Sequence, residues 1–317
     1  MERAKMDAKT EAAYRASLKQ ATDAGAAVLD RGGSALDSVE AVIKILEDDP
    51  LFNAGRGAVF TADGRNELDA AIMDGSTLKA GAVAGVTRTR HPISLARAVM
   101  ERSPHVFLIG PGADDFAKSV GLEQVDPGFF FTESRWQSLV KQLQMEGKPI
   151  PPRPAGAPPP PDKPVPTAQI EESADSHRFG TVGAVALDRQ GNVAAGTSTG
   201  GLQAKMEGRV GDSPIIGAGT YASNQSCAVS GTGAGEYFIR LTVAREVCAL
   251  VELKGLSLQQ AADRVIHKEL TDLKGDGGVI AIAPDGQMAW SFNTPGMFRA
   301  RIAEGGTIQI GIYNDEP

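Results

Sequence analysis

Residues 180–188 read Gly180-Thr181-Val182-Gly183-Ala184-Val185-Ala186-Leu187-Asp188, and the rest of the chain is organised around them. A glycine and a threonine lead into an apolar run, which predicts a buried strand. Turn-forming residues at 188–192 predict a reversal. A second run then ends at Thr199, so the two runs predict a hairpin. Taken alone, the Thr181 hydroxyl has an ordinary explanation, because threonine is common in strands.

Three glycine-rich segments accompany this hairpin. They are Thr197-Ser198-Thr199-Gly200-Gly201, Gly208-Arg209-Val210-Gly211-Asp212-Ser213-Pro214 and Gly231-Thr232-Gly233-Ala234-Gly235-Glu236. In this order and at these separations, they resemble the plant-type asparaginases, also called isoaspartyl peptidases, which are N-terminal-nucleophile hydrolases. The resemblance covers about residues 12–313 without the proline-rich middle. It implies an α/β fold in which two mainly antiparallel sheets lie between helical layers (αββα).

The composition bounds the class of protein. Of the 317 residues, 42% are hydrophobic, which suits a sizeable core, and the net charge of −7 argues against nucleic-acid or anionic-membrane partners. The sequence has no run of about 18 apolar residues, which excludes a transmembrane helix. The N-terminus lacks the apolar core of a signal peptide, so we expect a cytoplasmic protein. We expect Cys227 and Cys248 to be core residues and not a disulfide.

Hydrophobic periodicity and capping residues predict elements on both sides of the hairpin. Expected helices cover residues 7–29, 34–49, 92–100, 112–120, 134–146, 236–253 and 257–270. Expected strands cover residues 58–60, 67–73, 79–86, 105–109, 226–229, 278–283 and 287–292, with 105–109 buried. The alternating glycine and alanine of residues 79–86 indicate close approach of a neighbouring layer.

The composition changes at Lys148, because proline dominates as far as Pro166 and no packed element is expected there. From composition alone, the segment is either an interdomain linker or a stretch whose far end is cut. The resemblance implies the second interpretation. The chain then divides into an α chain of residues 1–180, which ends in a disordered tail (148–178), and a β chain of residues 181–317. The two chains form one αββα domain.

Cleavage of the Gly180–Thr181 bond would give Thr181 two reactive groups. Its freed α-amine has a reference pKa near 7.7–8.0, so part of it is neutral at physiological pH and can take the proton of its own hydroxyl. This chemistry requires no histidine. The four histidines have no spacing that suits a triad or a metal site, and we interpret them as structural or surface residues: His91, His105, His177 and His267.

The resemblance implies that Thr181 is the nucleophile and that Gly180–Thr181 is the site of autocatalytic cleavage. It also implies that the Thr199 hydroxyl supports the nucleophile, although by itself Thr199 would be an ordinary residue at the end of a strand. The Thr232 hydroxyl and the Gly233 N–H are expected to stabilise the oxyanion. Such preorganised donors are worth about 3 kcal/mol each.

Asn53 matches a further position, which approaches the reacting carbonyl. A loop asparagine that satisfies nearby backbone groups is the alternative. The surrounding loop, residues 46–56, resembles one that binds a sodium ion through main-chain carbonyls. We expect no other cofactor.

Arg209 and Asp212 lie three residues apart on a short, glycine-flanked loop. A guanidinium and a carboxylate can hold the α-carboxylate and the α-ammonium of an amino acid, although such a pair is more commonly a surface ion pair. The resemblance implies the binding role. The expected substrate-binding residues are Arg209, Val210, Gly211, Asp212, Thr232, Gly233, Ala234 and Gly235.

The resulting hypothesis is an amidohydrolase that cleaves L-asparagine and β-aspartyl dipeptides and assembles as a dimer of αβ heterodimers. Gly200 favours this branch over glycosylasparaginases, whose matching segment usually has asparagine there. An uncleaved, inactive scaffold is the other alternative. The family typically begins with an apolar strand and a His-Gly-Gly-Ala-Gly loop, which this sequence lacks, and we therefore expect the chain to mature slowly or not at all.

Overall fold

A five-stranded sheet is built around the hairpin that the sequence predicts. The computed structural model describes residue 3, residues 6–161 and residues 180–316. The two hairpin strands, β4 (Val182–Leu187) and β5 (Val193–Thr199), pair in antiparallel orientation. The other strands are β1 (Leu68–Asp74), β2 (Ala80–Val86) and β3 (Phe107–Ile109). The order is β3-β2-β1-β5-β4, and β3 runs parallel to β2.

A second sheet packs on one face of the first. Its strands, in the order β6-β7-β8-β9, are β6 (Thr220–Ala222), β7 (Ala228–Gly233), β8 (Gly277–Ile282) and β9 (Met288–Phe292). Val193 and Ala195 of β5 meet Ala222 and Ala228 of this sheet in a buried apolar cluster. A separate two-stranded sheet consists of β10 (Gly296–Arg301) and β11 (Gln309–Tyr313).

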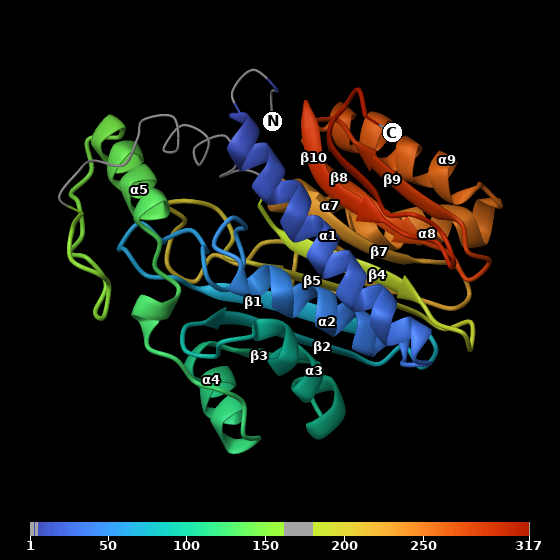
Figure 1. The fold of residues 1–317 in the computed structure, drawn as a ribbon, viewed down its shortest axis with the longest axis horizontal. Coiled ribbons are helices and arrows are strands. Elements are labelled where there is room, and N and C mark those ends of the chain that lie inside the picture. Colours follow the sequence, from blue (N-terminus) through green and yellow to red (C-terminus); the bar gives the residue numbers. More distant parts are fainter. Residues whose placement is uncertain (1–2, 4–5, 162–179, 317) are drawn as a thin grey trace.

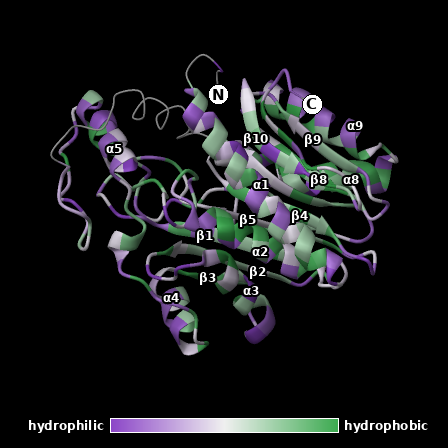
Figure 2. Cartoon of the chain, viewed as in Figure 1, coloured by the Kyte–Doolittle hydropathy of each residue, from purple (hydrophilic) through white to green (hydrophobic). Residues whose placement is uncertain are grey.

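Helices cover the outer faces of both sheets, which confirms the αββα fold (Figure 1). On the five-stranded sheet lie α2 (Ala35–Asp48) and α3 (Pro92–Arg102), while α1 (Ala8–Asp30) packs on α2 and on the β10–β11 ribbon. On the four-stranded sheet lie α7 (Gly235–Leu241), α8 (Val243–Lys254), α9 (Leu258–Asp263) and the π-helical segment η3 (Arg264–Leu270). The remaining elements are α4 (Gly110–Ser119), the 3-10 turn η2 (Pro127–Phe129) and α5 (Glu133–Met145). Hydrophobic residues gather in the strands of the central layers (Figure 2).

Local signals place the first two helices where the sequence predicts them. The Asp7 carboxylate accepts hydrogen bonds from the backbone N–H groups of Lys9 and Thr10, so α1 begins at the next residue. Ser34 and Asp37 form a reciprocal capping box at the start of α2. The close approach predicted at β2 is also confirmed, because a Cβ on Gly81 would lie only 1.9 Å from a carbonyl oxygen of α3.

The strand predicted at residues 58–60 is wrong. These residues form an irregular segment whose backbone groups pair with side chains. The Val59 N–H donates to Asn53 Oδ1, and the Phe60 N–H donates to Gln203 Oε1. The Asn66 amide donates to the carbonyls of residues 58 and 59. Side-chain amides therefore satisfy the backbone that a neighbouring strand would otherwise satisfy.

Two further predictions need correction. The strand at 105–109 is shorter than predicted and is not buried, because β3 lies at the sheet edge with Ile109 68% exposed. The helix predicted over 236–253 is two helices that meet at Thr242, which has a φ of +49°. The break follows from long-range contacts, since the N–H groups of Ala244 and Arg245 donate to carbonyls of the loop before β6.

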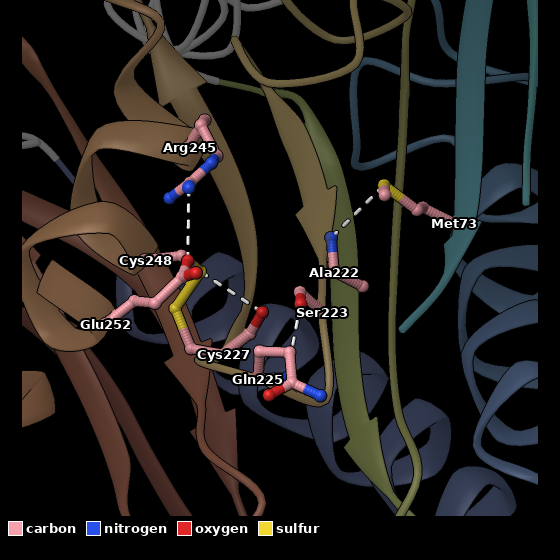
Figure 3. The surroundings of a disulfide bond; sticks show 8 residues. All are labelled: Met73, Ala222, Ser223, Gln225, Cys227, Arg245, Cys248 and Glu252. Atoms are coloured by element: carbon pink, nitrogen blue, oxygen red, sulfur yellow. Dashed lines mark hydrogen bonds and ion pairs between the residues drawn. A yellow bond between two sulfur atoms is a disulfide. The ribbon is translucent and has the colours of Figure 1, made fainter. Parts of the chain in front are cut away.

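The prediction that the two cysteines are not bridged is also wrong. Cys227, just before β7, forms a disulfide with Cys248 of α8, and their Cα atoms are 5.3 Å apart (Figure 3). The helix packs directly on the strand, which brings two cysteines 21 residues apart into bonding distance. Disulfides are typical of oxidising compartments, and the expectation of a cytoplasmic protein stays a prediction.

The prediction that the proline-rich segment does not pack is wrong for its first part. Residues 148–161 contain no helix or strand. Nevertheless, the Arg153 guanidinium donates to the Glu133 carboxylate at 2.6 Å and lies 4.7 Å from the centre of the Phe131 ring. This part of the predicted tail therefore packs against α5. The cleavage tail from residue 162 to 178, together with His177, lies outside the described residues.

Candidate active site

The start of β4 and the end of β5 bring two threonine hydroxyls together. Val182 pairs with Ser198 in the β4–β5 register, so the next cross-strand pair is Thr181 and Thr199. Their Oγ1 atoms are 3.0 Å apart. The Thr199 hydroxyl also accepts a hydrogen bond from the Gly201 N–H at 3.0 Å, which fixes its orientation. Sequence reasoning predicted this pair, and the register places it.

Asn53 holds the peptide that precedes Thr181. Its backbone N–H donates to the carbonyl oxygen of Gly180 at 2.8 Å. Its side-chain amide donates to the Gly201 carbonyl at 2.7 Å and accepts from the Val59 N–H at 2.9 Å. A Cβ on Gly180 would lie 2.5 Å from Asn53 Cβ, so only glycine allows this approach. The N–H therefore polarises the carbonyl of the Gly180–Thr181 bond.

Thr232 faces the same space as Thr181. Both residues line a cavity of about 80 Å³ between β4, β8 and β10. The Thr232 hydroxyl is buried and has no hydrogen-bond partner among the described residues. Gly233 follows it at the end of β7 and pairs with Gly277 of β8. A buried, unpartnered hydroxyl beside Thr181 is available to a ligand.

Arg209 and Asp212 lie close together against the start of α7. A Cβ on Gly235 would lie 2.9 Å from both Arg209 Nη2 and Asp212 Oδ1, so this contact requires glycine. Arg209 also donates from Nε and Nη2 to Glu236 Oε1, at 3.0 and 2.9 Å. Burial raises the pKa of Asp212 to about 7. Its Oδ2 atom has no hydrogen-bond partner among the described residues.

The other predicted binding residues shape this loop through their backbone. Val210 and Gly211 join the arginine to the aspartate, and the Arg209 guanidinium folds over Gly211. Ala234 caps the start of α7, and its N–H donates to the Asp276 carbonyl at 2.9 Å. Ala234 therefore positions the helix, and its N–H is engaged within the protein.

Sequence reasoning missed two charged residues beside the threonines. Asp69 of β1 lies directly opposite Thr199 in the register, and Lys205 follows the glycine pair after β5. Both residues are buried, with exposed fractions of 0% and 5%. Burial raises the pKa of Asp69 and lowers that of Lys205, while their mutual attraction opposes both shifts. Strand alternation in residues 67–73 is the signal that could have placed Asp69.

The loop at residues 46–56 closes on itself beneath β5. The Arg56 N–H donates to the Glu47 carbonyl at 2.7 Å. The Glu47 carboxylate is fully buried, which raises its pKa, and it accepts hydrogen bonds from Ser198 Oγ and the Ile93 N–H. The Glu47 and Gly55 carbonyls of this loop accept hydrogen bonds from the N–H groups of Arg56 and Ala58, and the expected sodium ion stays a prediction.

The described histidines lie away from the threonine pair. His91 Nδ1 is 3.2 Å from the Glu47 carboxylate, and His267 Nε2 is 3.9 Å from Asp263. The described part of the chain contains no group of three or more His, Cys, Asp or Glu side chains placed to hold a metal. Among the described helices, none has both the length and the apolar character of a membrane span.

Comparisons with known proteins find related sequences over most of this chain. The model of the asparaginase family matches residues 1–312. An isoaspartyl peptidase from Salmonella typhimurium is 47% identical over 99% of this chain and 95% of its own length. An Escherichia coli isoaspartyl peptidase is 48% identical over 99% and 93%. A probable isoaspartyl peptidase/L-asparaginase from Arabidopsis thaliana is 45% identical over 93% and 91%.

Proposed function

The chain belongs to the asparaginase family, and we propose that it is an isoaspartyl peptidase and L-asparaginase whose nucleophile is Thr181, released by autocleavage. The observation that carries the proposal is the geometry at residues 180 and 181. The Thr181 hydroxyl meets a second hydroxyl at 3.0 Å, and a backbone N–H polarises the carbonyl of the preceding peptide bond.

Maturation starts from this arrangement. Thr181 Oγ1 attacks the carbonyl carbon of Gly180, and the oxyanion that forms is stabilised by the Asn53 N–H. The hydroxyl proton passes to the peptide nitrogen, the C–N bond breaks, and an ester joins Gly180 to Thr181 Oγ1. Water then hydrolyses the ester, which leaves a carboxylate on Gly180 and a free α-amine and hydroxyl on Thr181.

The mature residue repeats the chemistry on a substrate. The α-amine takes the hydroxyl proton, and Oγ1 attacks the side-chain amide carbon of asparagine or a β-aspartyl peptide. The Thr232 hydroxyl and the Gly233 N–H stabilise the oxyanion. The proton returns to the leaving nitrogen, so ammonia or the peptide's amine departs. Water then hydrolyses the acyl-enzyme to release aspartate.

The charged loop fits the aspartyl group that these substrates share. Arg209 would bind the α-carboxylate, and Asp212 would bind the α-ammonium. The unpartnered Asp212 Oδ2 supports this role. Binding must displace or share the hydrogen bonds between Arg209 and Glu236.

A glycosylasparaginase is disfavoured by the packing at Gly200. A Cβ at this position would lie 2.5 Å from Asn53 Oδ1 and 2.7 Å from Ala58 Cβ. An asparagine therefore does not fit in this structure. We further infer a cytoplasmic dimer of αβ heterodimers with sodium held by carbonyls of the 46–56 loop, and each of these three points stays a prediction.

Two variants of Thr181 test the proposal. Thr181→Ala should remain a single 33.1 kDa chain and release no ammonia from asparagine, because it has no hydroxyl. Thr181→Ser should keep part of both activities, since a primary hydroxyl preserves the chemistry. Denaturing electrophoresis and an ammonia assay measure the two steps.

Thr77→Ala is the matched control, because it removes a threonine hydroxyl from an exposed turn. It should mature and react as the wild type does. Complete cleavage of the Thr181→Ala chain would contradict the assignment. A wild-type chain that stays intact and releases no ammonia would favour an inactive scaffold.

A further inference from the structure

Three residues from adjacent strands form a row on the face that meets the second sheet. Thr199 of β5 lies between Asp69 of β1 and Thr181, which directly precedes β4. Directly opposed residues of antiparallel strands share a face, with Cβ atoms about 4.5–5.5 Å apart. The Thr197 hydroxyl, two residues before Thr199 in β5, bonds Ser230 of β7, which identifies the face.

Asp69 is an incompletely satisfied carboxylate at the end of this row. Its Oδ1 atom accepts the Gly85 N–H at 2.9 Å. Its Oδ2 atom is buried and has no hydrogen-bond partner in the described part of the chain. A buried carboxylate is stable as an anion only if a cation lies near it.

Lys205 is a buried cation in the same region, and its attraction lowers the pKa of Asp69 against the effect of burial. Its Nζ atom donates to the Glu67 carbonyl at 2.9 Å, at the start of β1. The same atom lies 3.0 Å from the position that a Cβ would take on Gly201. Because the Gly201 N–H bonds Thr199 Oγ1, the ammonium lies beside the backbone that holds the threonine pair.

We propose that Asp69 and Lys205, two buried side chains of opposite charge, together set the basicity of the Thr181 α-amine after cleavage. The inference rests on the proposed function, because that function supplies the amine. The two residues are positioning residues: Asp69 favours the ammonium form of the amine, Lys205 favours the neutral form that acts as the base, and the balance between them sets the working pH.

Other charged groups also face the row. They are Glu67, which directly precedes β1, Arg209 and Asp212 of the loop after β5, and Glu236 of α7, while Glu47 of α2 lies behind the sheet. Arg209 and Asp212 belong to the head-group site, so substrate neutralises them. Asp69 and Lys205 do not belong to the head-group site, so substrate binding leaves their charges unchanged.

Removing each of the two charges is expected to shift the pH dependence of kcat in an opposite direction. Asp69→Asn removes a negative charge and should lower the pKa of the amine, which shifts the acid limb of kcat to lower pH. Lys205→Met removes a positive charge and should shift it to higher pH. Because these charges act on the amine through a partly screened interior, each shift should be about 0.5–1 pH unit. The double variant should return close to the wild-type limb.

Two measurements are made on each purified, matured variant. The first is kcat for asparagine between pH 5 and about pH 9, at saturating substrate, so that the limb reports the enzyme–substrate complex. The second is the pH dependence of acylation of the Thr181 amine by an N-hydroxysuccinimide ester, followed by mass spectrometry. Acylation does not require turnover, so it reports the pKa of the amine even in variants with a low kcat.

Asp74→Asn is the matched control, because it removes a carboxylate from the other end of β1 and should leave both curves unmoved. Lys205→Arg keeps the charge and should keep the wild-type curve, which covers the case in which Lys205→Met does not mature. Unmoved curves for Asp69→Asn and Lys205→Met, or shifts of the same sign, would overturn the inference while leaving the function intact. An uncleaved wild-type chain would overturn both proposals.

Discussion

At the scale of single residues, burial of Asp212 changes the pKa of the carboxylate that is proposed to bind substrate. Taking its carboxylate out of water raises the pKa to about 7, so the anion that should bind a substrate ammonium is only partly present at neutral pH. An incoming ammonium would stabilise the charged form. Substrate binding and ionisation of Asp212 are therefore coupled.

This coupling predicts the pH dependence of KM. Below pH 7, protonation of free Asp212 should raise KM by up to about tenfold per pH unit, because substrate must first displace the proton. At saturating substrate, kcat should not follow this titration. Asp212→Asn should raise KM by about tenfold to a hundredfold, since a charge-assisted hydrogen bond is lost, and should abolish its pH dependence.

Initial rates with asparagine between pH 5 and about pH 8 measure both effects. Glu207→Gln is the control, because Glu207 lies on the same loop as Asp212 but its carboxylate is 64% exposed and pairs with Arg65. If KM of the wild type is flat through pH 7 while kcat falls, Asp212 does not bind the ammonium.

At the scale of elements, close packing of β2 on α3 depends on a single missing side chain. Gly81→Ala places a methyl group 1.9 Å from the Ala96 carbonyl oxygen, so strand and helix must separate. Overpacking of this kind costs about 1–3 kcal/mol or more, and we expect a lower urea midpoint of unfolding. Gly112→Ala is the matched control, because nothing lies within 4 Å of its added Cβ in α4. Equal midpoints for the two variants would contradict the packing argument.

Elements with local signals were predictable from sequence, and elements with distant partners were not. Asp7 and Ser34 predict the starts of their helices, because each side chain accepts a hydrogen bond from a backbone N–H three residues later. The end of α7 at Thr242 depends on carbonyls some 25 residues earlier in the chain. The strands of the β10–β11 ribbon were not predicted from the sequence.

Some residues of the candidate site were likewise predictable from the sequence, and others were not. Thr181, Thr199 and Thr232 lie in motifs that resemble a known family, and the structure brings them together or onto one cavity. Asp69 and Lys205 lie outside those motifs. Their placement beside Thr199 follows from strand register and from one backbone contact, neither of which the sequence alone specifies.

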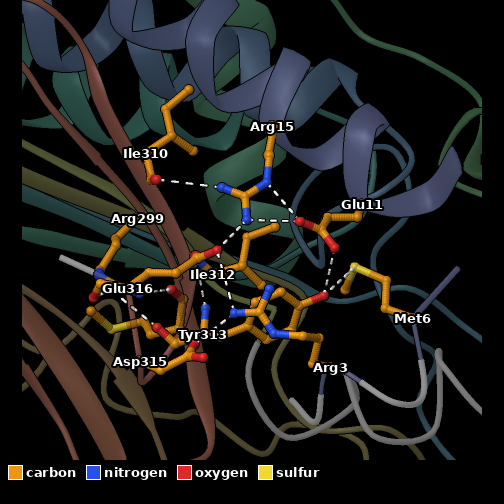
Figure 4. Close-up of polar contacts among 11 residues, drawn as sticks. Arg3, Met6, Glu11, Arg15, Arg299, Ile310, Ile312, Tyr313, Asp315 and Glu316 are labelled. Carbon is orange, nitrogen blue, oxygen red and sulfur yellow. Dashed lines mark hydrogen bonds and ion pairs between the residues drawn. The ribbon is translucent and has the colours of Figure 1, made fainter. Parts of the chain in front are cut away.

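At the scale of the whole molecule, the first helix and the last strand hold the two halves of the chain together. Arg15 of α1 donates to the Glu316 carboxylate at 2.5 Å, and the Tyr313 hydroxyl of β11 donates to Glu11 at 3.0 Å (Figure 4). The Tyr14 ring stacks on Phe298 of β10 at 4.1 Å between ring centres. After cleavage at residue 180, these contacts would join two separate chains.

Glu316 is a carboxyl of this contact whose pKa the surroundings shift. Burial raises the pKa of Glu316. The N–H groups of Ile312 and Tyr313 and the Arg15 guanidinium lower it by a larger amount, so the net pKa is below the ordinary value of 4.5. A carboxyl whose folded pKa is depressed stabilises the fold fully above its unfolded pKa. This contribution is lost as the pH falls through the folded pKa.

Glu316→Ala should therefore destabilise the protein by about 1.5–3 kcal/mol at pH 7, because its hydrogen bonds involve a charged group. The difference from wild type should shrink as the pH falls below about 4.5. Asp315→Ala is the matched control, since its ion pair with Arg3 is more than half exposed and worth little. Thermal unfolding between pH 3 and about pH 7 measures both variants. A Glu316→Ala deficit that persists unchanged at pH 3 would mean that Glu316 contributes through packing and not through its charge.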